Sequence, residues 1–515
     1  MLTGATYPAM LALGMLKPAP SRAFGLEGKG NGKKIIILGS GIAGMTAAWE
    51  LGKLGYDCIV LEARNRPGGR CFSVRKGTTN SEITNGFQQA SFDEGLYFNA
   101  GPSRIPHHHG ITLDYCRQLK IPLEIYNNVN EAAYYFSEGS GPLRNKKIRI
   151  REIQNDVRGY MNELLAKAID QKLINEGFTN EDASIILEYL RAEGGLDLDK
   201  LYKASSRRGY SVAPAAGTVE GSVAAAYTLK DLLSSGFLHP DFYNVAQYTY
   251  ELQMTMFQCV GGNDKIAEAL AKQLPGKIRL NSIVTKIEDS PGSVTISYKE
   301  GGTEKQITGD ACICTIPLPV LSNIDHNFNS ETSRAIDYIS YISTGKIGLQ
   351  FKRRFWEEDE GVYGGITHSN NELTQIFYPN NNYQGNKGIL IGYYNFNEKA
   401  KKVGALNYSD REKLALQKGR LIHPQYDHEF EKSFSISWHK DPFNLGGWAL
   451  YSNEERNSLY KVLLEPKGRV YFSGEHLTYW NAWMAGAFES ARMVCDQLHA
   501  KLTAQRTQYR PLFNT

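Results

Sequence analysis

The run Gly39-Ser40-Gly41-Ile42-Ala43-Gly44 constrains the fold of this chain more than any other feature, because of what stands on either side of it. The apolar residues 34–38 are typical of a buried strand, and residues 45–54 are typical of a helix. Glycine permits a tight turn at the first position of the run, a close backbone approach to a phosphate at the third, and close helix packing at the sixth. The N-terminus of such a helix offers unpaired amides and a positive dipole end to an anion.

A second strand pattern, residues 56–61, ends in Glu62, which follows the last glycine of the run by 18 residues. An acid about 20 residues after such glycines is the expected partner of a ribose hydroxyl. A glycine-rich turn in an ordinary α/β protein is the alternative. Strand, helix, second strand and acid in this order favour a βαβ unit that binds a dinucleotide.

The segment after the acid, Glu62-Ala63-Arg64-Asn65-Arg66-Pro67-Gly68-Gly69-Arg70, adds a basic turn with two adjacent glycines. Further backbone groups and a fork-shaped guanidinium can meet the same diphosphate there. This stretch resembles the extended motif of the flavin-dependent amine oxidase superfamily. The resemblance therefore points to FAD and not to a nicotinamide cofactor.

Composition fits one large enzyme. A chain of 515 residues with 42% apolar residues is expected to divide into two or three lobes. The net charge of +4 comes with no dense basic run, so the sequence predicts no nucleic-acid binding. Seven cysteines without a CxxC pair indicate buried thiols, and neither a disulfide framework nor a zinc site; their odd number leaves the redox compartment open.

No segment has the 18 or so apolar residues that a membrane helix needs. The longest apolar stretch, residues 5–16, is followed by small residues and prolines but has no basic region before it. It fits either the remnant of an export signal or an amphipathic arm. The protein is accordingly expected to be either exported, to the periplasm or outside the cell, or cytoplasmic.

Patterns along the rest of the chain interleave helices and strands. A helical face of 3, 4, 3, 4 spacing is formed by Val157, Tyr160, Met161, Leu164, Leu165, Ala168 and Ile169. Thr179 and Asp182 predict a capped helix start. Strands are expected at 277–288, 293–299, 311–316, 338–355, 361–367, 373–378, 388–395 and 469–473, and a last helix at 484–498.

This order predicts an α/β fold in which a discontinuous nucleotide-binding domain is interrupted by substrate-facing segments. The resemblance makes this prediction more specific: it implies a Rossmann-like FAD-binding domain of the GR2 flavoprotein type, with a mixed-sheet substrate domain and a helical insertion. The expected boundaries are 1–32 for an N-terminal arm, 33–105, 260–320 and 465–500 for the FAD-binding domain, 110–240 for the helical domain, and 241–260 and 321–464 for the substrate-binding domain.

A closer resemblance covers nearly the whole chain from residue 33. Five motifs fall in the order seen in L-amino-acid oxidases: Gly101-Pro102-Ser103-Arg104-Ile105-Pro106, Val260-Gly261-Gly262, Gly345-Lys346-Ile347, Phe355-Trp356 and Gly474-Glu475. A buried guanidinium can bind the carboxylate that separates an amino acid from a simple amine through two charge-assisted hydrogen bonds. The resemblance gives this role to Arg104, whose alternative is a surface arginine in a Gly-Pro turn.

The resemblance implies further substrate and catalytic residues. Tyr393 would donate its hydroxyl to the second carboxylate oxygen, although neighbouring Tyr394 leaves the register open by one residue. Tyr378 is a weaker candidate for the pocket wall. Lys346, a lysine inside an apolar strand, would hold a water near flavin N5 and assist reoxidation by dioxygen. Trp483 would lie beside the substrate α-carbon.

The carbonyl of Ala482 would accept a hydrogen bond from the substrate amine, at a position where relatives often have glycine. The helix that begins near Met484 would direct its positive end at the flavin, which would be bound without a covalent link. The residues expected to bind FAD are Gly39, Ser40, Gly41, Ala43, Gly44, Glu62, Ala63, Arg64, Gly69, Arg70, Gly101, Pro102, Ser103, Arg104, Val284, Gly474, Glu475, Trp483, Met484 and Ala485.

The implied reaction is oxidative deamination of an L-amino acid by hydride transfer from the α-carbon to flavin N5. Dioxygen and water complete it, and the products are a 2-oxo acid, ammonia and hydrogen peroxide. Alternatives are a primary-amine or polyamine oxidase, a tryptophan 2-monooxygenase-like enzyme, and a flavin-bound scaffold without activity. Large apolar or aromatic substrates and a homodimer are expected. His107-His108-His109 lacks the spaced partners of a metal site, so no metal is expected.

Overall fold

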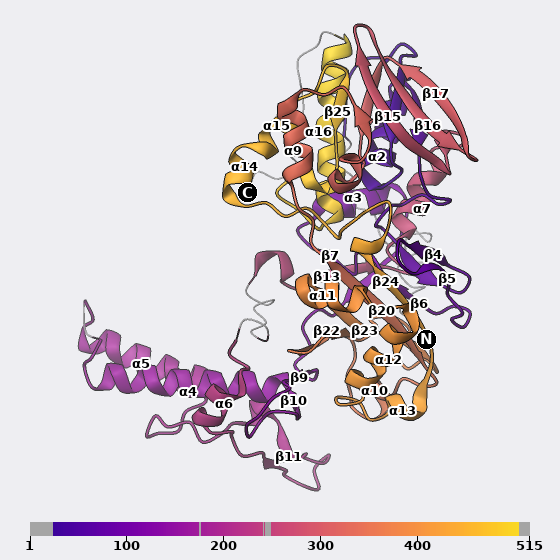
Figure 1. Cartoon of the computed structure of the whole chain (residues 1–515). Coiled ribbons are helices and arrows are strands. Elements are labelled where there is room, and N and C mark those ends of the chain that lie inside the picture. The colour runs from indigo at the N-terminus through magenta and orange to yellow at the C-terminus, as the bar shows by residue number, and fades with distance from the viewer. Residues whose placement is uncertain (1–23, 175–176, 240–241, 243–248, 504–515) are drawn as a thin grey trace, which may run out of the picture.

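The computed structural model describes residues 24–174, 177–239, 242 and 249–503. The N-terminal stretch interpreted as an export signal or arm lies largely outside these residues, up to residue 23. Two sheets organise the molecule, one near each end of its long axis in Figure 1. The fold is α/β, as predicted, and the candidate site lies where segments from the two sheets meet.

A five-stranded parallel sheet forms the upper part of Figure 1, in the order β14-β2-β1-β18-β25. Its strand β1 is apolar over most of its length because both faces are covered: Ile35 and Ile37 pack into one core cluster, and Ile36 and Leu38 into another. The strands are β1 (Lys34–Leu38), β2 (Asp57–Leu61), β14 (Ile278–Arg279), β18 (Ala311–Cys314) and β25 (Val470–Phe472). All of them lie within the three segments expected for the nucleotide-binding domain.

Helices cover one face of this sheet, and a small four-stranded mixed sheet with further helices covers the other. The first face carries α2 (Ile42–Lys53), α3 (Gly110–Gln118), α7 (Lys265–Lys272) and α16 (Met484–Thr503). The second carries β15 (Ser282–Ser290), β16 (Ser293–Glu300), β17 (Thr303–Gly309), β19 (Asp325–His326), α8 (Leu318–Leu321), α9 (Ser330–Tyr338) and α15 (Leu459–Leu464), and α14 (Asn453–Asn457) contacts α15. The predicted hairpin is β15–β16, and β17 is an additional strand that the pattern did not separate.

The second large sheet has seven strands in the order β10-β9-β21-β22-β23-β20-β24. It is mixed, because β9 pairs with β21 in parallel while the other neighbours are antiparallel. Its strands are β9 (Tyr134–Phe136), β10 (Lys147–Arg149), β20 (Thr344–Phe351), β21 (Ile366–Ser369), β22 (Gln375–Phe377), β23 (Gly388–Phe396) and β24 (Phe430–Ser437). The sequence patterns predicted β20 to β23, but not β9, β10 or β24.

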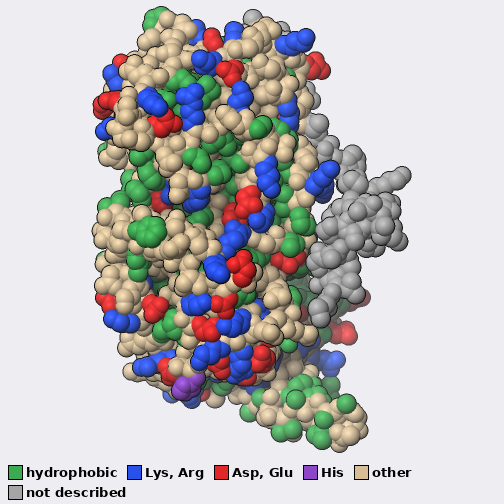
Figure 2. Space-filling model, turned by 90° about the vertical axis from the view of Figure 1, so that its right-hand side faces the viewer, with side chains coloured by type: hydrophobic (Ala, Val, Ile, Leu, Met, Phe, Trp, Pro, Cys, Tyr) green, Lys and Arg blue, Asp and Glu red, His purple; other side chains and the backbone are tan. Residues whose placement is uncertain are grey.

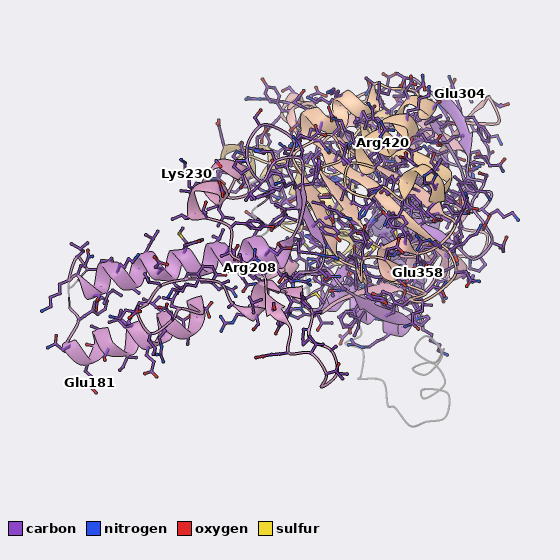
Figure 3. All side chains as sticks on the ribbon, turned by 90° about the horizontal axis from the view of Figure 1, so that it is seen from below. Glu181, Arg208, Lys230, Glu304, Glu358 and Arg420 are labelled. Atoms are coloured by element: carbon purple, nitrogen blue, oxygen red, sulfur yellow. The ribbon has the colours of Figure 1, made fainter. Side chains whose placement is uncertain are left out.

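A pair of helices, α4 (Ile150–Asp170) and α5 (Asn180–Gly194), projects from the body in Figures 1 and 3. The predicted capping box of Thr179 and Asp182 starts α5 and is confirmed. The predicted apolar face of α4 is divided, however: Tyr160 and Ile169 pack in the cluster that joins α4 to α5, whereas Met161, Leu164 and Leu165 are 40%, 48% and 41% exposed. Ala166 also packs in this cluster, and Asn162 lies against Gly194 of α5.

The expected helical insertion, residues 110–240, also contains strands. These are β8 (Leu123–Tyr126), β9, β10, β11 (Tyr210–Val212) and β12 (Ser222–Val223), alongside α6 (Leu229–Ser235) and the 3₁₀ turn η1 (Ser206–Arg208). The other elements are β3 (Ser73–Arg75), β4 (Thr79–Glu82), β5 (Gly86–Gln89), β6 (Tyr97–Asn99), β7 (Ile105–Pro106), β13 (Met256–Cys259), α10 (Phe355–Glu358), α11 (Asn397–Gly404), α12 (Tyr408–Gly419), α13 (Tyr426–Glu429), η2 (Tyr250–Leu252), η3 (Trp438–Lys440) and η4 (Glu475–Leu477).

Charged side chains of both signs are interspersed on the face shown in Figure 2. All seven cysteines are buried free thiols. Within the described ranges, no helix has the length and apolar character needed to cross a bilayer.

Candidate cofactor and substrate site

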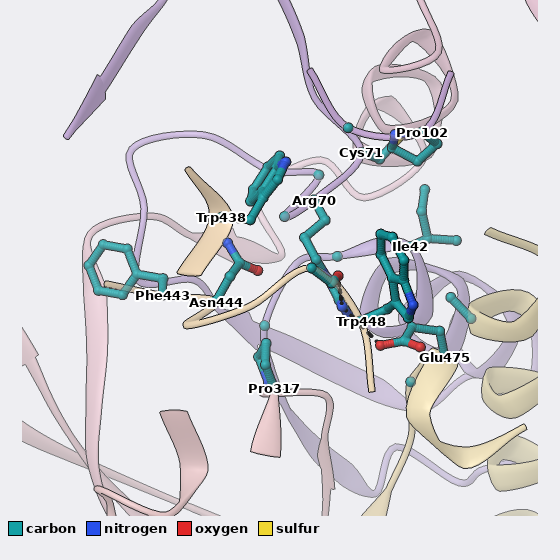
Figure 4. A pocket seen from close by; sticks show the side chains of 18 of the residues that line it. Ile42, Arg70, Cys71, Pro102, Pro317, Trp438, Phe443, Asn444, Trp448 and Glu475 are labelled. Atoms are coloured by element: carbon teal, nitrogen blue, oxygen red, sulfur yellow. Dashed lines mark hydrogen bonds and ion pairs between the residues drawn. The ribbon is translucent and has the colours of Figure 1, made fainter. Parts of the chain in front are cut away.

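A cavity of about 450 Å³ lies between the parallel sheet and the seven-stranded sheet. Its walls come from distant parts of the chain: the glycine turn after β1, the loop before β7, strands β20, β22 and β23, and the segment before α16. Figure 4 shows part of this lining, with Arg70 and Glu475 facing each other. The cavity thus joins the predicted dinucleotide site to the predicted substrate site.

The glycine turn has the geometry that its sequence predicts. Gly39 adopts a φ of 99°, and a Cβ there would lie 2.7 Å from Thr315 Oγ1. A Cβ on Gly44 would lie 2.0 Å from the carbonyl oxygen of Gly39, so α2 packs against the turn only because a side chain is absent. Gly41 is the N-cap of α2 and provides no side-chain cap. The first amides of α2 therefore remain available for an anionic ligand.

Glu62 lies at the carboxyl end of β2 and lines the cavity. Its Oε2 accepts hydrogen bonds from Ser40 N at 2.8 Å and Ser40 Oγ at 2.7 Å. Its Oε1 accepts one from Arg64 N at 2.9 Å. A carboxylate has about four acceptor positions. One position on Glu62 is therefore free for a ribose hydroxyl.

Most of the residues expected to bind the cofactor line the cavity: Gly39, Gly41, Ala43, Glu62, Ala63, Arg64, Gly69, Arg70, Gly101, Pro102, Ser103, Arg104, Val284, Gly474, Glu475, Trp483 and Met484. Ser40, Gly44 and Ala485 do not. Ser40 binds Glu62, Gly44 packs on the glycine turn, and Ala485 is buried in the core cluster around α2 and α16.

Arg70 and Glu475 form an ion pair in the wall of the cavity. Arg70 Nη1 donates to Glu475 Oε1 at 2.9 Å and to the carbonyl oxygen of Gly447 at 2.6 Å. The neighbouring Glu475 carboxylate raises the pKa of Arg70 against the opposing effect of burial. The other oxygen of Glu475 accepts a hydrogen bond from Ala482 N at 3.3 Å. The pair therefore connects the predicted diphosphate region to the segment that precedes α16.

Arg104 lines the cavity from the loop between β6 and β7. Its Nη1 donates to Asn128 Oδ1 at 2.8 Å, and its guanidinium carbon lies 5.8 Å from the centre of the Phe377 ring. In the part of the chain that the structure describes, no carboxylate lies within ion-pair distance of Arg104. Its charge also helps to lower the pKa of buried His368 to about 4, after the larger effect of burial. This end of the cavity is therefore positively charged.

Lys346 extends from β20 toward the same end of the cavity and is buried. Its Nζ donates to the carbonyl oxygens of Asn99 at 3.1 Å and Gly101 at 2.6 Å, and lies 2.8 Å from Ser103 Oγ. Burial, assisted by Arg104, holds the pKa of the Lys346 amine well below its usual range. Three oxygens therefore surround Nζ at hydrogen-bond distance. A water could be held at Nζ only by displacing one of these partners.

The tyrosine of β23 that faces the cavity is Tyr394, not the favoured Tyr393. Gly348 pairs with Ile391 and Ile347 pairs with Tyr393, so Gly392 is an extra residue in the ladder. This bulge reverses the alternation of side chains, places Tyr393 in the core and turns Tyr394 and Phe396 toward the cavity. The ring of Tyr394 lies 4.4 Å from Lys346 Nζ. The register of the prediction is therefore corrected by one residue.

Tyr378 does not reach the cavity either. It is buried in the core of the seven-stranded sheet, where its hydroxyl bonds Thr367 Oγ1 at 2.8 Å and His423 Nε2 at 2.7 Å. Strand β22 ends at Phe377, and the cavity-facing side chains of that strand are Gln375 and Phe377. The prediction that Tyr378 forms a pocket wall is thus wrong.

Ala482 and Trp483 both line the cavity at the start of α16. Ala482 has a φ of 68°, in the left-handed region that favours glycine. The ring of His109 lies 5.0 Å from that of Trp483, and burial lowers the pKa of His109 to about 3. Across the described residues no group of metal-ligating side chains is present, and the three histidines instead pack against aromatic rings.

Sequence reasoning missed several side chains that line the cavity. They are Gln375, Phe377, Phe396, Trp448 and Thr344. The sequence did contain a signal for two pairs of lining residues, 375 with 377 and 394 with 396. The members of each pair are two positions apart, and strand residues at this spacing point to the same face. Phe377, Phe396 and Trp448 thus add aromatic rings to the lining of the cavity.

Comparison with known proteins agrees with this geometry. The family model for flavin containing amine oxidoreductases matches residues 42–499. YobN of Bacillus subtilis (strain 168), whose name describes it provisionally as an L-amino-acid oxidase, is 26% identical and spans 92% of this chain and 96% of its own. The L-amino-acid oxidase BjussuLAAO-I of Bothrops jararacussu is 26% identical and spans 90% of each chain. The solved structure of wild-type putrescine oxidase bound to putrescine superposes with a TM-score of 0.60 at 15% identity, over 91% of this chain and 99% of that one.

Proposed function

The chain belongs to the flavin containing amine oxidoreductase family, and we propose that within this family it catalyses the oxidative deamination of L-amino acids. FAD is the cofactor, and the enzyme is an FAD-dependent oxidoreductase with a small-molecule substrate. The observation that carries the finer proposal is Arg104, a cavity-lining guanidinium without an acidic partner among the described residues. Relatives named L-amino-acid oxidases over 90% or more of this chain support it.

The residues of the cavity fit FAD. The glycine turn leaves no room for side chains, the N-terminus of α2 has no side-chain cap, and Glu62 keeps one acceptor position free. The chemistry that bound FAD supplies is acceptance of a hydride equivalent from the substrate α-carbon and its delivery to dioxygen as hydrogen peroxide. The imino acid left behind reacts with water to give a 2-oxo acid and ammonia.

The protein's own part in this reaction is to hold the substrate. Arg104 binds the carboxylate with two parallel hydrogen bonds, and the Tyr394 hydroxyl donates to the same group. The Ala482 carbonyl accepts from the neutral amine, and Trp483 limits movement of the α-carbon. Fixing both polar groups of the amino acid leaves its α-hydrogen in one orientation, and such positioning contributes a large part of an enzymatic rate.

A diamine fits this cavity less well. The second ammonium group of a diamine would approach the guanidinium of Arg104, which carries the same charge. The surrounding wall offers it aromatic rings and no carboxylate among the described lining residues near Arg104. The decisive assay therefore compares an L-amino acid with the amine that remains after loss of its carboxylate. We expect rapid flavin bleaching without oxygen, and stoichiometric peroxide with oxygen, for a large apolar or aromatic L-amino acid only.

Three outcomes of that assay would contradict the proposal. Faster bleaching by the decarboxylated amine would assign the chain to amine oxidation. Bleaching by the amino acid followed by release of an amide and carbon dioxide in place of peroxide would assign it to monooxygenase chemistry. If neither compound bleaches the flavin, an enzymatic role for these substrates is excluded.

Replacement of Lys346 by methionine is expected to slow the reaction with dioxygen more than the reaction with the substrate. The amine lies over the ring of Tyr394, and it organises Asn99, Gly101 and Ser103. Loss of one preorganised donor reduces a rate by about 100-fold. Stopped-flow measurement of each half-reaction tests this.

The matched control is Lys352→Met, which removes an exposed lysine just beyond the end of β20 and is expected to leave both half-reactions unchanged. Equal slowing of the two half-reactions in Lys346→Met would show that Lys346 acts on the fold of the site and not on reoxidation.

The proposal includes a homodimer in which a second copy covers the exposed face of α4. Because α4 and α5 project from the body, two copies can pack α4 against α4 while the bodies remain apart (Figures 1 and 3). Light scattering is expected to give twice the mass of the chain for the wild type and a monomer for Leu164→Glu. Ile83→Glu, at an exposed position between β4 and β5, should remain dimeric. A monomeric wild type would contradict the proposal.

A further inference from the structure

Ala482 holds an unfavourable backbone conformation at the point where the substrate amine is expected to bind. Its φ of 68° is left-handed, which is unfavourable for a residue other than glycine. Its neighbours in the chain are Asn481, which reaches outward, and Trp483, which lines the cavity with it. A conformation of this kind persists only when surrounding contacts fix it.

Those contacts come from outside the cavity, through Arg456 on α14. Its Nη1 donates to the carbonyl oxygen of Thr478 at 2.9 Å, and its Nη2 donates to Asn481 Oδ1. The side-chain Nδ2 of Asn481 donates in turn to the carbonyl oxygen of Ala449 at 3.2 Å. Arg456 therefore holds the segment on both sides of Trp480, immediately before the left-handed residue.

Three tyrosine rings surround the Arg456 guanidinium. Their centres lie 4.1 Å (Tyr451), 4.6 Å (Tyr460) and 4.6 Å (Tyr479) from its central carbon. Within the described ranges, Arg456 has no acidic partner at ion-pair distance, so these rings and the two oxygens balance its charge. The hydroxyls of Tyr451 and Tyr460 also donate to the carbonyl oxygens of His476 and Leu477. Tyr451 and Tyr460 thus connect Arg456 to η4.

The inner side of the segment is fixed by Glu475. Its Oε2 accepts from Ala482 N, while its Oε1 accepts from Arg70 Nη1 in the wall of the cavity. Ala482 is consequently held from the cavity side by a carboxylate and from the outer side by Arg456 through Asn481. Figure 1 shows α14 and α15 beside the start of α16, as this arrangement requires.

We propose that Arg456 is a positioning residue for the substrate site: it keeps Ala482 left-handed, so that the Ala482 carbonyl and Trp483 face the reacting α-carbon. The expected effect of Arg456 on kcat rests on the proposed function. Its expected effect on the backbone around Ala482 does not. It assigns a role in catalysis to a side chain that touches neither substrate nor cofactor.

The first test measures hydrogen exchange of the amides in residues 475–483 of the FAD-loaded protein without substrate. Arg456→Met keeps an apolar stem between the tyrosine rings but removes both hydrogen bonds, and we expect at least about tenfold faster exchange in this segment. Arg334→Met is the matched control, because Arg334 also lies over a tyrosine ring, at 5.4 Å from Tyr338 on α9. Unchanged exchange in Arg456→Met would overturn the proposal whatever the substrate is.

The second test is a kinetic cycle with Ala482→Gly. Glycine adopts a positive φ without strain, so the segment needs Arg456 less in the Ala482→Gly variant. Arg456→Met is expected to lower kcat for the amino acid about tenfold when alanine is present but no more than about threefold when glycine replaces it, because about 1 kcal/mol of strain corresponds to about fivefold. KM, set mainly by Arg104, should change less than kcat.

Equal losses of kcat in the two backgrounds would show that Arg456 acts only on overall stability, and the positioning role would be abandoned. If exchange accelerates as expected while no amino acid is oxidised even by the wild type, the structural role of Arg456 stands and the proposed function fails. The two ideas are therefore separately testable.

Discussion

Replacement of Arg104 by methionine is expected to lower kcat/KM for L-amino acids by about 30- to 5,000-fold, mostly through KM. Methionine has a similar length and is apolar, so it removes the charge and both parallel hydrogen bonds to the carboxylate. Truncation of one partner of a buried charge pair costs about 2–5 kcal/mol, which is the basis of this range. Steady-state peroxide formation over a wide range of substrate concentrations measures the effect.

Two further measurements show whether the loss of activity comes from the contact between Arg104 and the substrate carboxylate. Arg104→Lys keeps a positive charge but loses the planar fork, and is expected to fall between wild type and Arg104→Met. The decarboxylated amine lacks the group that Arg104 binds, so its slow oxidation should not decrease further in Arg104→Met. A KM for amino acids that stays at the wild-type value would remove Arg104 from the substrate site and with it the main support for an amino-acid substrate.

Substitution of Gly44 by alanine is expected to yield protein that is largely free of flavin. The added Cβ would lie 2.0 Å from the carbonyl oxygen of Gly39, and this oxygen belongs to the backbone of the turn that we expect to face the FAD diphosphate. The turn must open to accept the methyl group. Overpacking of about 1–3 kcal/mol corresponds to a loss of FAD affinity of about 5- to 140-fold. Flavin absorbance per mole of purified protein, and titration of the apoprotein with FAD, measure it.

Gly52 offers a control within the same helix. A Cβ at this position meets no atom within 4 Å, so Gly52→Ala should retain full flavin content. It should also increase the free energy of unfolding by about 0.5–1 kcal/mol, because alanine loses less conformational entropy than glycine in a helix. Full flavin loading of Gly44→Ala would contradict the view that helix packing at this position shapes the cofactor site.

The parts of the fold that could be predicted from sequence are those where local pattern and burial agree. Strand β1 is an apolar run because both faces of the parallel sheet are covered, and the spacing of the glycines that follow it matches a turn into a helix. The α4 stripe shows the opposite case. Its spacing correctly predicts a helix, but spacing carries no information about the partner, and the structure turns Met161, Leu164 and Leu165 outward. Short strands such as β9 and β10 are too brief to show a period.

The candidate site divides in the same way. Arg104, Lys346 and Trp483 line one cavity as their motifs led us to expect. The tyrosine of β23 could not be chosen from alternation, because the extra residue Gly392 reverses the faces and is visible only in the pairing with β20. The role proposed for Arg456 could not be found from the sequence, since it depends on a contact with Asn481, 25 residues along the chain, and on the backbone angle of Ala482.

The parallel sheet has a consequence for synthesis on the ribosome. Strands β1 and β2 emerge early, while β25 and α16, which complete the sheet and cover its helical face, are made almost last. A nascent chain must therefore keep an apolar sheet edge and an incomplete flavin cradle until translation is nearly over, which exposes it to aggregation and to chaperones. We therefore expect FAD to bind only late in synthesis, and chains interrupted before β25 to carry no flavin.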